Sequence, residues 1–201
     1  MVYVAIVLLI VAVLGFYLMR SKTVVNKEAV QNIMTRTSIR DYTNDSVGDD
    51  IVETILRAAM AAPSAGNKRP WAFIVVRNVS LLHSIAAQVR PHEPVGGASV
   101  AIVVCADTSD AKTFEGEGKM FWVQDCSAAT QNILLAAHAQ RLGAVWCGVY
   151  PLEERCNLLR DLLDIPQNVV PFSIVAIGYP REDKKPQDKW DSSLVRQNKW
   201  Y

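Results

Sequence analysis

Residues 100–106 read VAIVVCA, and this stretch decides the fold class because every position in it is apolar. A strand that is buried on one face alone would alternate apolar and polar residues, so the pattern predicts a strand with both faces covered. Three further runs, at 72–77, 144–149 and 172–178, are rich in β-branched and aromatic residues and predict three more strands. A sheet of such strands needs a layer of helices on each face.

Helical spacing of apolar residues between these strands predicts the covering helices. The pattern that begins at Ile51 ends before Pro63, because proline cannot continue a helix. The longest pattern, 120–142, is broadly apolar, and Gly143 is predicted to be its C-terminal cap. Strands and helices in this order describe an α/β or α+β layered domain. The other predicted segments are a helix at 81–89, a loop at 107–119, a helix that opens at Pro151 and a polar tail at 179–201.

The composition excludes several classes of function. The 201 residues include 21 Lys and Arg and 20 Asp and Glu, so the net charge of +1 gives no electrostatic case for binding nucleic acid. The four cysteines form no C-x-x-C pair and the three histidines are scattered along the chain. Neither a metal site nor a hydrolytic triad is therefore predicted.

The N-terminal segment, residues 2–19, holds 18 residues without a charge. As a helix it would extend about 27 Å, close to the thickness of the hydrocarbon core of a bilayer. Basic residues follow this run and none precedes it, which predicts a membrane anchor with the remaining chain in the cytoplasm. The competing interpretations are a cleaved signal peptide, whose basic residues would precede the run, and a buried core helix. The predicted organisation is an anchor at 1–20, a linker or first helix at 21–34 and a folded domain at 35–201.

The segment RTSIR at 36–40 brings two guanidinium groups and two hydroxyl groups together within five residues. In an extended segment, residues 36, 38 and 40 point to one side and form a cluster of donors that suits a phosphate. The competing interpretation is a solvated surface segment with ion pairs to Asp41 or Asp45.

Two glycine-bearing segments have a composition that allows a ligand to approach the backbone. The sequence PSAGNKRPW at 63–71 concentrates small residues between a predicted helix and a predicted strand. The sequence GAVWCG at 143–148 brackets a short strand with glycines, so a flat ring could lie against its amide groups. The competing interpretations are a plain helix–strand connection and an ordinary core strand.

In this order, the three segments resemble the FMN-dependent nitroreductase family. The family pattern R-x-S-x-R with a following aromatic residue is matched at 36–42, and its P-S-x-x-N-x-Q-P-W loop is matched at 63–71, with Arg69 in place of the frequent Gln. A G-L-G-x-x-W-x-G-like strand is matched up to Gly148, although Arg141 replaces its first glycine. The closing G-Y-P and N-K-W motifs are matched at 178–180 and 198–200.

The resemblance implies an α+β fold, a nitroreductase-like three-layer α/β/α sandwich with a central mixed sheet. It also implies a homodimer with two FMN sites at the subunit interface. The 36–40 segment would hold the phosphate and ribityl chain, residues of the 63–67 loop would come from the other subunit, and the 145–148 strand would offer its backbone to the ring. By resemblance, the cofactor-binding residues are Arg36, Thr37, Ser38, Arg40, Pro63, Ser64, Ala65, Asn67, Val145, Trp146, Cys147, Gly148, Arg196 and Lys199.

The activity that the resemblance implies is an FMN-dependent NAD(P)H oxidoreductase. NAD(P)H, the co-substrate, would pass a hydride to flavin N5, and a nitroaromatic, a quinone or a similar small acceptor would then replace it in a ping-pong cycle. The flavin carries this chemistry, so no side chain is predicted to be catalytic. One alternative is a reductive dehalogenase resembling iodotyrosine deiodinase, in which the 107–119 loop, with Glu115, Glu117 and Lys119, would close over a zwitterionic substrate. The other is a membrane-tethered flavin-binding protein without enzymatic activity.

Overall fold

The computed structural model describes residues 27–89, 92–110 and 112–200. The chain divides into two compact units, residues 1–33 and 34–201. Helix α2 (Lys27–Thr35) spans this division. The sheet, its covering helices and the candidate site all belong to the second unit. In the described residues no helix has the length and apolar character needed to cross a bilayer, and the predicted anchor at 2–19 lies outside them.

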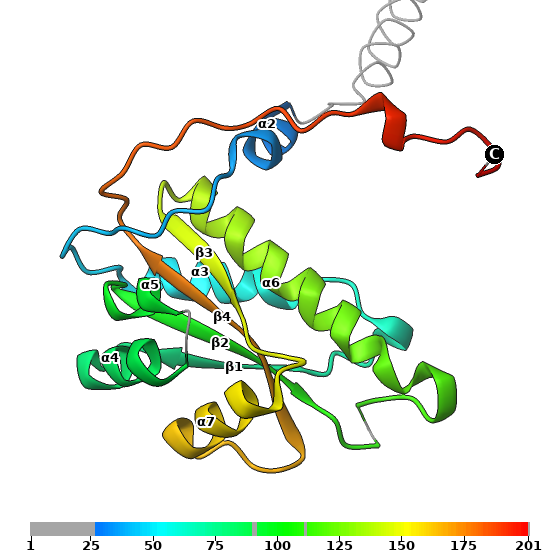
Figure 1. Ribbon diagram of the computed structural model, residues 1–201, viewed down its shortest axis with the longest axis horizontal. Coiled ribbons are helices and arrows are strands. Elements are labelled where there is room, and N and C mark those ends of the chain that lie inside the picture. Colours follow the sequence, from blue (N-terminus) through cyan, green and yellow to red (C-terminus); the bar gives the residue numbers. More distant parts are fainter. Residues whose placement is uncertain (1–26, 90–91, 111, 201) are drawn as a thin grey trace, which may run out of the picture. The chain divides into compact units, whose positions relative to one another are not determined.

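Four strands form one sheet in the order β1-β2-β4-β3, and each neighbouring pair is antiparallel (Figure 1). The residues of the 100–106 stretch are at most 1 % exposed, because β2 lies inside the sheet and is covered on both faces. The prediction of a mixed sheet is wrong for these four strands. Within the described residues, the one parallel pairing is the isolated bridge between Ser38 and Ala144. The strands are β1 (Trp71–Val76), β2 (Val100–Asp107), β3 (Gly143–Gly148) and β4 (Val169–Gly178).

Strand β4 begins three residues before the predicted start because it continues through an irregularity in its pairing with β2. Val104 pairs with Ser173 and Cys105 pairs with Pro171, so the residue between them, Phe172, has no partner in the register. Proline has no N–H to donate to a ladder and is tolerated in a strand at such a bulge. Because Pro171 lies inside β4, the sequence pattern alone did not show that the strand begins before the proline.

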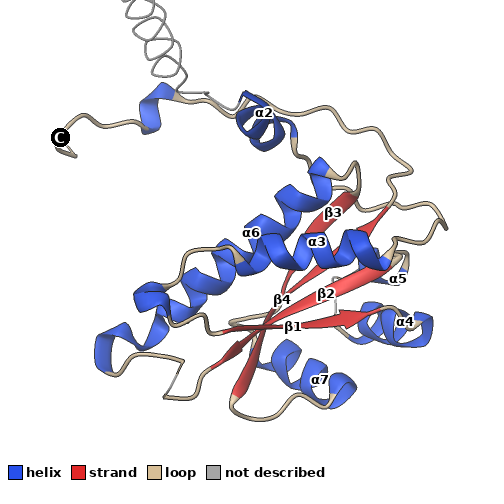
Figure 2. Ribbon diagram, turned by 180° about the vertical axis from the view of Figure 1, so that it is seen from behind, coloured by secondary structure: helices blue, strands red, loops and turns tan. Residues whose placement is uncertain are grey.

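Helices cover both faces of the sheet, which makes the domain a three-layer α+β fold (Figures 1 and 2). Alternate residues of β2 point to opposite faces. Val100, Ile102 and Val104 join one apolar cluster, whereas Ala101 and Val103 join the other. Helices α3 (Asp49–Met60) and α6 (Phe121–Ala139) cover the first face, and α4 (Val79–Gln88), α5 (Glu93–Gly96) and α7 (Glu153–Leu163) cover the second.

Helix α6 ends earlier than predicted, and Gly143 is not its cap. Arg141 takes the left-handed conformation at the helix end, with φ of 61°, and the N–H of Leu142 donates to the carbonyl of Ala137 at 2.9 Å. These features are those of a helix C-terminus closed by a left-handed residue. Gly143 instead begins β3, where a Cβ atom would lie 2.8 Å from the Cβ of Ile39.

The predicted 107–119 loop contains a short helix. Residues Gly116–Met120 form the 3₁₀ helix η2, which leads directly into α6. Two further 3₁₀ turns are η1 (Ala65–Asn67) and η3 (Ser192–Leu194).

We expect Gly143→Ala to lower the free energy of unfolding by about 1–3 kcal/mol, because the added methyl group overlaps a backbone-attached atom of Ile39 that cannot turn away. Urea denaturation measures this change. Gly97→Ala is the matched control, because Gly97 has φ of −95° and open space where its Cβ would lie. Equal stability of both variants would show that Ile39 does not pack against Gly143 in solution.

Candidate functional site

The 36–40 segment lies beside the first residues of β3. The N–H of Ile39 donates to the carbonyl of Ala144 at 3.1 Å, next to the parallel bridge of Ser38. The Ile39 side chain is buried in the core, so Ser38 and Arg40 point to the other side of the extended chain. The segment is therefore extended at this point, as the sequence predicts.

The start of the C-terminal tail holds this segment in place. The N–H of Arg40 donates to Glu182 at 3.0 Å, and this hydrogen bond is the main reason that the pKa of Glu182 is lowered. The Lys184 ammonium group lies 3.5 Å from the carbonyl of Ser38, and the hydroxyl of Thr37 lies 3.5 Å from the carbonyl of Lys184. Lys184 thus joins the cluster, although the sequence pattern did not identify it, and its ammonium group pairs with Glu182 at 3.4 Å.

The competing interpretation, ion pairs of the segment's arginines with Asp41 or Asp45, does not hold. Asp41 lies 3.9 Å from Arg181, and Asp45 accepts a hydrogen bond from the hydroxyl of Thr43. In the described parts of the chain, neither Arg36 nor Arg40 has a carboxylate within 4.0 Å of its guanidinium group. Their charges are therefore available to an anionic ligand.

Arg36 has a buried guanidinium nitrogen, Nη1, that makes no hydrogen bond within the described residues. Burial lowers the pKa of the His138 imidazole on α6, and the nearby charge of Arg36 lowers it further. The Nε2 atom of His138 is 2.9 Å from the Thr35 hydroxyl. A buried donor without a partner is costly in free energy, so an anion bound near Nη1 would supply the hydrogen-bond acceptor that this atom lacks.

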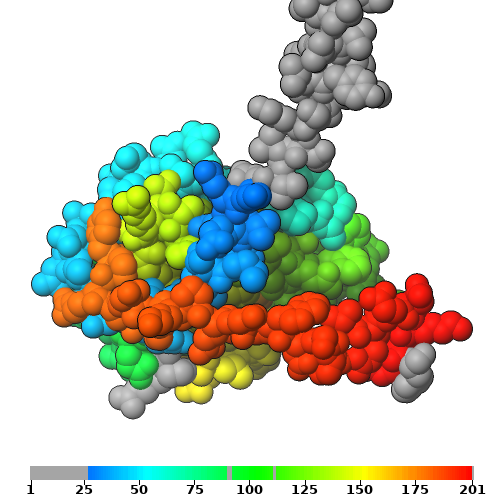
Figure 3. All heavy atoms as spheres, turned by 90° about the horizontal axis from the view of Figure 1, so that it is seen from above, coloured from blue at the N-terminus to red at the C-terminus, as the bar shows by residue number. Residues whose placement is uncertain are grey.

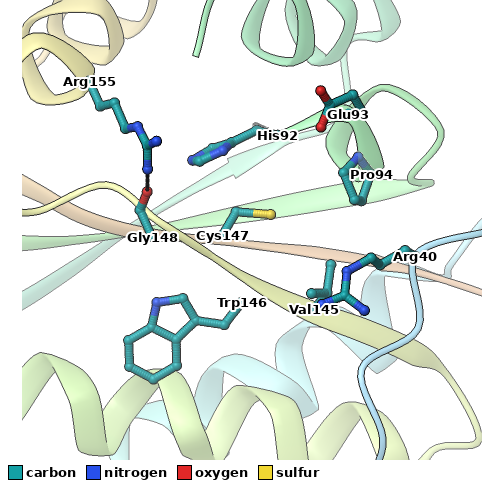
Figure 4. Close-up of a pocket in the computed structure, with 9 residues that line it drawn as sticks. All are labelled: Arg40, His92, Glu93, Pro94, Val145, Trp146, Cys147, Gly148 and Arg155. Carbon is teal, nitrogen blue, oxygen red and sulfur yellow. Dashed lines mark hydrogen bonds between the residues drawn. The ribbon is translucent and has the colours of Figure 1, made fainter. Parts of the chain in front are cut away.

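A cavity of about 620 Å³ lies along β3 beyond this segment (Figure 4). Its size is typical of a site for a small organic ligand. Of the predicted 36–40 residues, Arg40 lines the cavity, whereas Arg36, Thr37 and Ser38 do not. The other lining residues come from α5 and the residue before it, from β3 and from α7. The full lining is Arg40, His92, Glu93, Pro94, Val145, Trp146, Cys147, Gly148 and Arg155.

The backbone of β3 presents hydrogen-bonding groups to the open side of the strand. Peptide groups of successive strand residues point alternately to the two sides, and the carbonyl of Ala144 points away from β4, toward Ile39. The N–H and C=O groups of Trp146 and Gly148 therefore point to the same open side. The Gly148 carbonyl accepts a hydrogen bond from Arg155 at 2.9 Å. The two N–H groups can bind the polar edge of a flat ligand.

The side chains of β3 point alternately toward the cavity and into the core. Figure 4 shows Cys147 on the side of His92 and the Trp146 ring on the opposite side. Burial raises the pKa of the Cys147 thiol to about 11, so it stays protonated at neutral pH and is no nucleophile. The Trp146 ring packs against Phe172 at a centroid distance of 5.7 Å. Of these two residues, Trp146 can therefore contribute only its backbone to the cavity.

The 63–71 loop has a conformation that is fixed by hydrogen bonds, but it does not line the cavity. The N–H of Ala65 donates to Asp125 on α6 at 2.9 Å, and the hydroxyl of Ser64 accepts from the N–H of Arg69 at 3.0 Å. Gly66, Asn67 and Arg69 have positive φ angles near 50°, and the Phe114 ring lies over Gly66, where a Cβ would be 2.7 Å from it. The predicted residues Pro63, Ser64, Ala65 and Asn67 are thus separate from the cavity of their own chain.

The predicted tail residues Arg196 and Lys199 do not line the cavity either. Arg196 donates to the carbonyl of Ser193 and stacks over the Trp200 ring at 5.5 Å. The tail, orange and red in Figure 3, extends past the edge of the domain. Trp190, Leu194 and Trp200 are each more than 70 % exposed on it.

The comparisons with known proteins agree on one family. The model of the Nitroreductase family matches residues 33–179. A relative from Archaeoglobus fulgidus, provisionally named NADH dehydrogenase/NAD(P)H nitroreductase, is 46% identical over 177 residues, which cover 87% of this chain and 99% of the relative. A protein of Haliscomenobacter hydrossis named iodotyrosine deiodinase is 28% identical over 174 residues, which cover 73% of this chain and 77% of that protein.

Solved structures give the same result. A Parabacteroides distasonis protein with the same provisional name has a TM-score of 0.80 and 35% identity, over 86% of this chain and 99% of that one. A provisionally named nitroreductase from Desulfovibrio desulfuricans, crystallised in complex with FMN, has a TM-score of 0.72 and 33% identity, over 86% and 98% of the two chains.

We expect the stability of the domain to depend on the ionisation of Asp125. This carboxyl group is 6 % exposed, and burial raises its pKa, although the hydrogen bond from Ala65 acts in the opposite direction. As pH rises from 3.8 through the raised pKa, the folded chain must release a proton that the unfolded chain has already lost, so the free energy of unfolding falls. Asp125→Asn keeps an oxygen acceptor for Ala65 and should lose this fall, as urea denaturation at several pH values will measure.

Asp107→Asn provides the contrasting control. The N–H of Ser109 lowers the pKa of Asp107, so the wild-type carboxylate contributes stability that is lost as pH falls below 3.8 toward the lowered pKa. The two substitutions should therefore change the pH profile in opposite senses. Parallel profiles for wild type and Asp125→Asn would contradict the raised pKa.

Proposed function

Because this chain belongs to the nitroreductase family, we propose that it is an FMN-dependent NAD(P)H oxidoreductase that reduces nitroaromatic, quinone or similar small acceptors. The observation that carries this proposal is the cavity along β3, which has Arg40 at one end and backbone N–H groups along its side; Arg36, four residues before Arg40, lies outside its lining but has a buried guanidinium nitrogen without a partner. The FMN in the related Desulfovibrio desulfuricans crystal structure supports the choice of cofactor.

The residues of the site fit the two ends of FMN. A phosphate carries negative charge and several acceptor oxygens, which match the buried Nη1 of Arg36 and the nearby Arg40 and Lys184. The isoalloxazine ring is flat and carries acceptor atoms at its edge, which match the N–H groups of Trp146 and Gly148. The cavity volume of about 620 Å³ leaves room for a flat ring beside β3.

When bound, FMN accepts two electrons and a proton from NAD(P)H as a hydride and passes electrons on to the acceptor. The protein itself binds and orients. Arg36 and Arg40, with Lys184 beside them in its pair with Glu182, would hold the phosphate end, and the Trp146 and Gly148 amides would hold the ring edge. The Cys147 thiol stays protonated at the cavity wall because its pKa is raised, so it does not compete as a nucleophile for reactive acceptors.

The proposal includes a homodimer. The 63–67 loop is separate from the cavity of its own chain, so it can border a flavin only if that flavin belongs to a second copy. The strongly exposed Trp190, Leu194 and Trp200 on the tail support such an assembly, since a partner would remove their apolar surface from water. In this arrangement Asp125 fixes the loop that one subunit presents to the other.

The first experiment is a visible absorption spectrum of the purified full chain with FMN, recorded before and after anaerobic addition of NADPH and then NADH. We expect flavin bands that lose their intensity on reduction and return when a quinone or nitroaromatic compound is added. Absence of FMN binding would overturn the proposal. Bound FMN that neither nucleotide reduces would instead favour a flavin-binding protein without enzymatic activity. Reoxidation by halotyrosines, with release of halide, would assign the deiodinase activity named for the Haliscomenobacter hydrossis relative.

We expect Arg36→Gln to raise the dissociation constant of FMN about 10- to 100-fold, the loss of one charge-assisted hydrogen bond, while riboflavin binding changes little. Riboflavin lacks the phosphate, so the pair of ligands separates phosphate recognition from ring binding. Fluorescence titration of both flavins gives the two constants. The matched control is Arg57→Gln, because Arg57 is an exposed arginine on α3 that pairs with Glu53. An equal loss for both flavins would contradict the assignment of Arg36 to the phosphate.

We further propose that residues 2–19 anchor the protein in a membrane, with the enzyme domain in the cytoplasm; this rests on the uncharged sequence alone. The full chain should then stay in the membrane fraction of cells after carbonate washing. Leu9→Lys combined with Val11→Lys should release it, because each lysine at the centre of a span costs about 2.5–3.5 kcal/mol. Recovery of both the wild-type chain and the double variant in the soluble fraction would contradict the anchor.

A further inference from the structure

Arg155 places a second positive charge in the cavity, at the end away from Arg40 (Figure 4). It lies in the first turns of α7, and its Nη1 atom donates to the carbonyl of Gly148 at 2.9 Å. This hydrogen bond reaches across from a helix on one face of the sheet to the last residue of β3. The guanidinium group is therefore held at the cavity rather than extended into solvent.

The charge of Arg155 is not neutralised by an ion pair. In the described residues no carboxylate lies within 4.0 Å of its guanidinium group, although Glu153 and Glu154 precede it on α7. The acid among the cavity residues is Glu93, which Figure 4 shows near the Arg40 end. The Gly148 end of the cavity thus combines a cation with the outward N–H of Gly148 and favours negative charge.

The orientation of the ligand follows from the proposed function, on which this inference rests. With the phosphate at the Arg36–Arg40 cluster, the ligand extends along β3. From Val145 to Gly148 the strand advances about 10 Å at 3.3 Å per residue. In this orientation Gly148 and Arg155 would hold the ring end of FMN, and the phosphate end would be held away from them.

We infer that Arg155 is the residue that makes this site bind reduced FMN more tightly than it otherwise would, and so raises the reduction potential of the flavin. Hydride transfer from NAD(P)H adds two electrons and one proton to the neutral oxidised ring, which leaves it with one negative charge, while the nucleotide departs as NAD(P)⁺. A guanidinium group beside the ring attracts that new charge and has little interaction with the neutral ring.

The hydrogen bond to Gly148 adds to this effect. By engaging the Gly148 carbonyl, Arg155 neutralises an acceptor that would otherwise present partial negative charge beside the ring. At Gly148 the group left on the open side of β3 is then its N–H donor. The same contact fixes the direction of the Gly148 peptide, so the charge and the backbone donor act on the same edge of the ligand.

The test compares the dissociation constants of oxidised and reduced FMN in the full-length protein, measured anaerobically by fluorescence titration and checked by the midpoint potential. For Arg155→Gln we expect about a tenfold loss of affinity for reduced FMN relative to oxidised FMN, the size of a partly screened charge interaction. The midpoint potential should fall accordingly. Arg155→Met should behave in the same way, and Arg155→Lys, which keeps the charge, should retain most of the wild-type ratio.

Arg160→Gln is the matched control. Arg160 lies on the same helix and also donates to a backbone carbonyl, that of Val169 at 3.1 Å, but it does not line the cavity. Its substitution should leave the ratio unchanged. Thermal unfolding of each variant checks that the fold is retained.

Three outcomes would overturn the inference. Parallel loss of affinity for both forms of FMN in the uncharged variants would mean that Arg155 acts only on the structure of the cavity. An unchanged ratio would mean that its charge does not reach the ring. A raised KM for NAD(P)H with an unchanged ratio would assign the guanidinium group to the co-substrate. Wild-type protein that binds no FMN would instead refute the proposed function, which keeps the two failures distinct.

Discussion

The constraint on which the structure depends is the burial of β2 and β4 on both faces. Their apolar side chains on each side of the sheet require a helical layer on each side, and these layers leave only the outer edges of β1 and β3 with accessible backbone. A ligand that uses main-chain hydrogen bonds can therefore reach the sheet only at an edge. The cavity lies at the β3 edge, where residues of α5 and α7 line it together with the strand.

One small contact connects this layered core to the site. Gly143 has no side chain, so Ile39 can pack directly on the first residue of β3 and its N–H can reach Ala144. The buried isoleucine holds Ser38 and Arg40 outward at the end of the cavity. Because Arg40 also binds Glu182, the segment is fixed from two directions before any ligand arrives. Such fixation reduces the entropy that a phosphate must overcome on binding.

The sequence was sufficient for the strands, for the two-sided burial and for the segments that carry donor groups. Uninterrupted apolar runs such as 100–106 have few alternatives once a sheet forms, and local composition marks RTSIR and PSAGNKRPW. Whether neighbouring strands pair in parallel or antiparallel could not be predicted from the sequence, because connections of this length permit either direction. Gly143 was misassigned because a glycine after a helix also fits a cap; Arg141 took that conformation instead.

Two residues that reach the site from other elements were also missed. Lys184 contacts Ser38 across 146 positions, so no local pattern marks it. Arg155 follows Gly148 closely in the sequence but lies on a separate helix, and its contact depends on how the turn between β3 and α7 brings that helix back to the strand. Arg196 and Lys199, which the resemblance predicts to bind the cofactor, lie on a tail whose apolar residues are exposed in one chain. The spacing of residues along one chain does not show which of them a second copy would cover.

The aromatic cluster beneath β3 has a spectroscopic consequence. Trp146 packs on Phe172, which also contacts Trp122, and Trp122 packs on Tyr150 at a centroid distance of 4.8 Å. Two indole groups are thus held in fixed positions within the domain, and one of them lies directly across the strand from the cavity. Their excitation energy would be transferred to any chromophore in that cavity that absorbs at the wavelengths of tryptophan emission. The protein therefore carries its own optical reporter of cavity occupancy, without an added label.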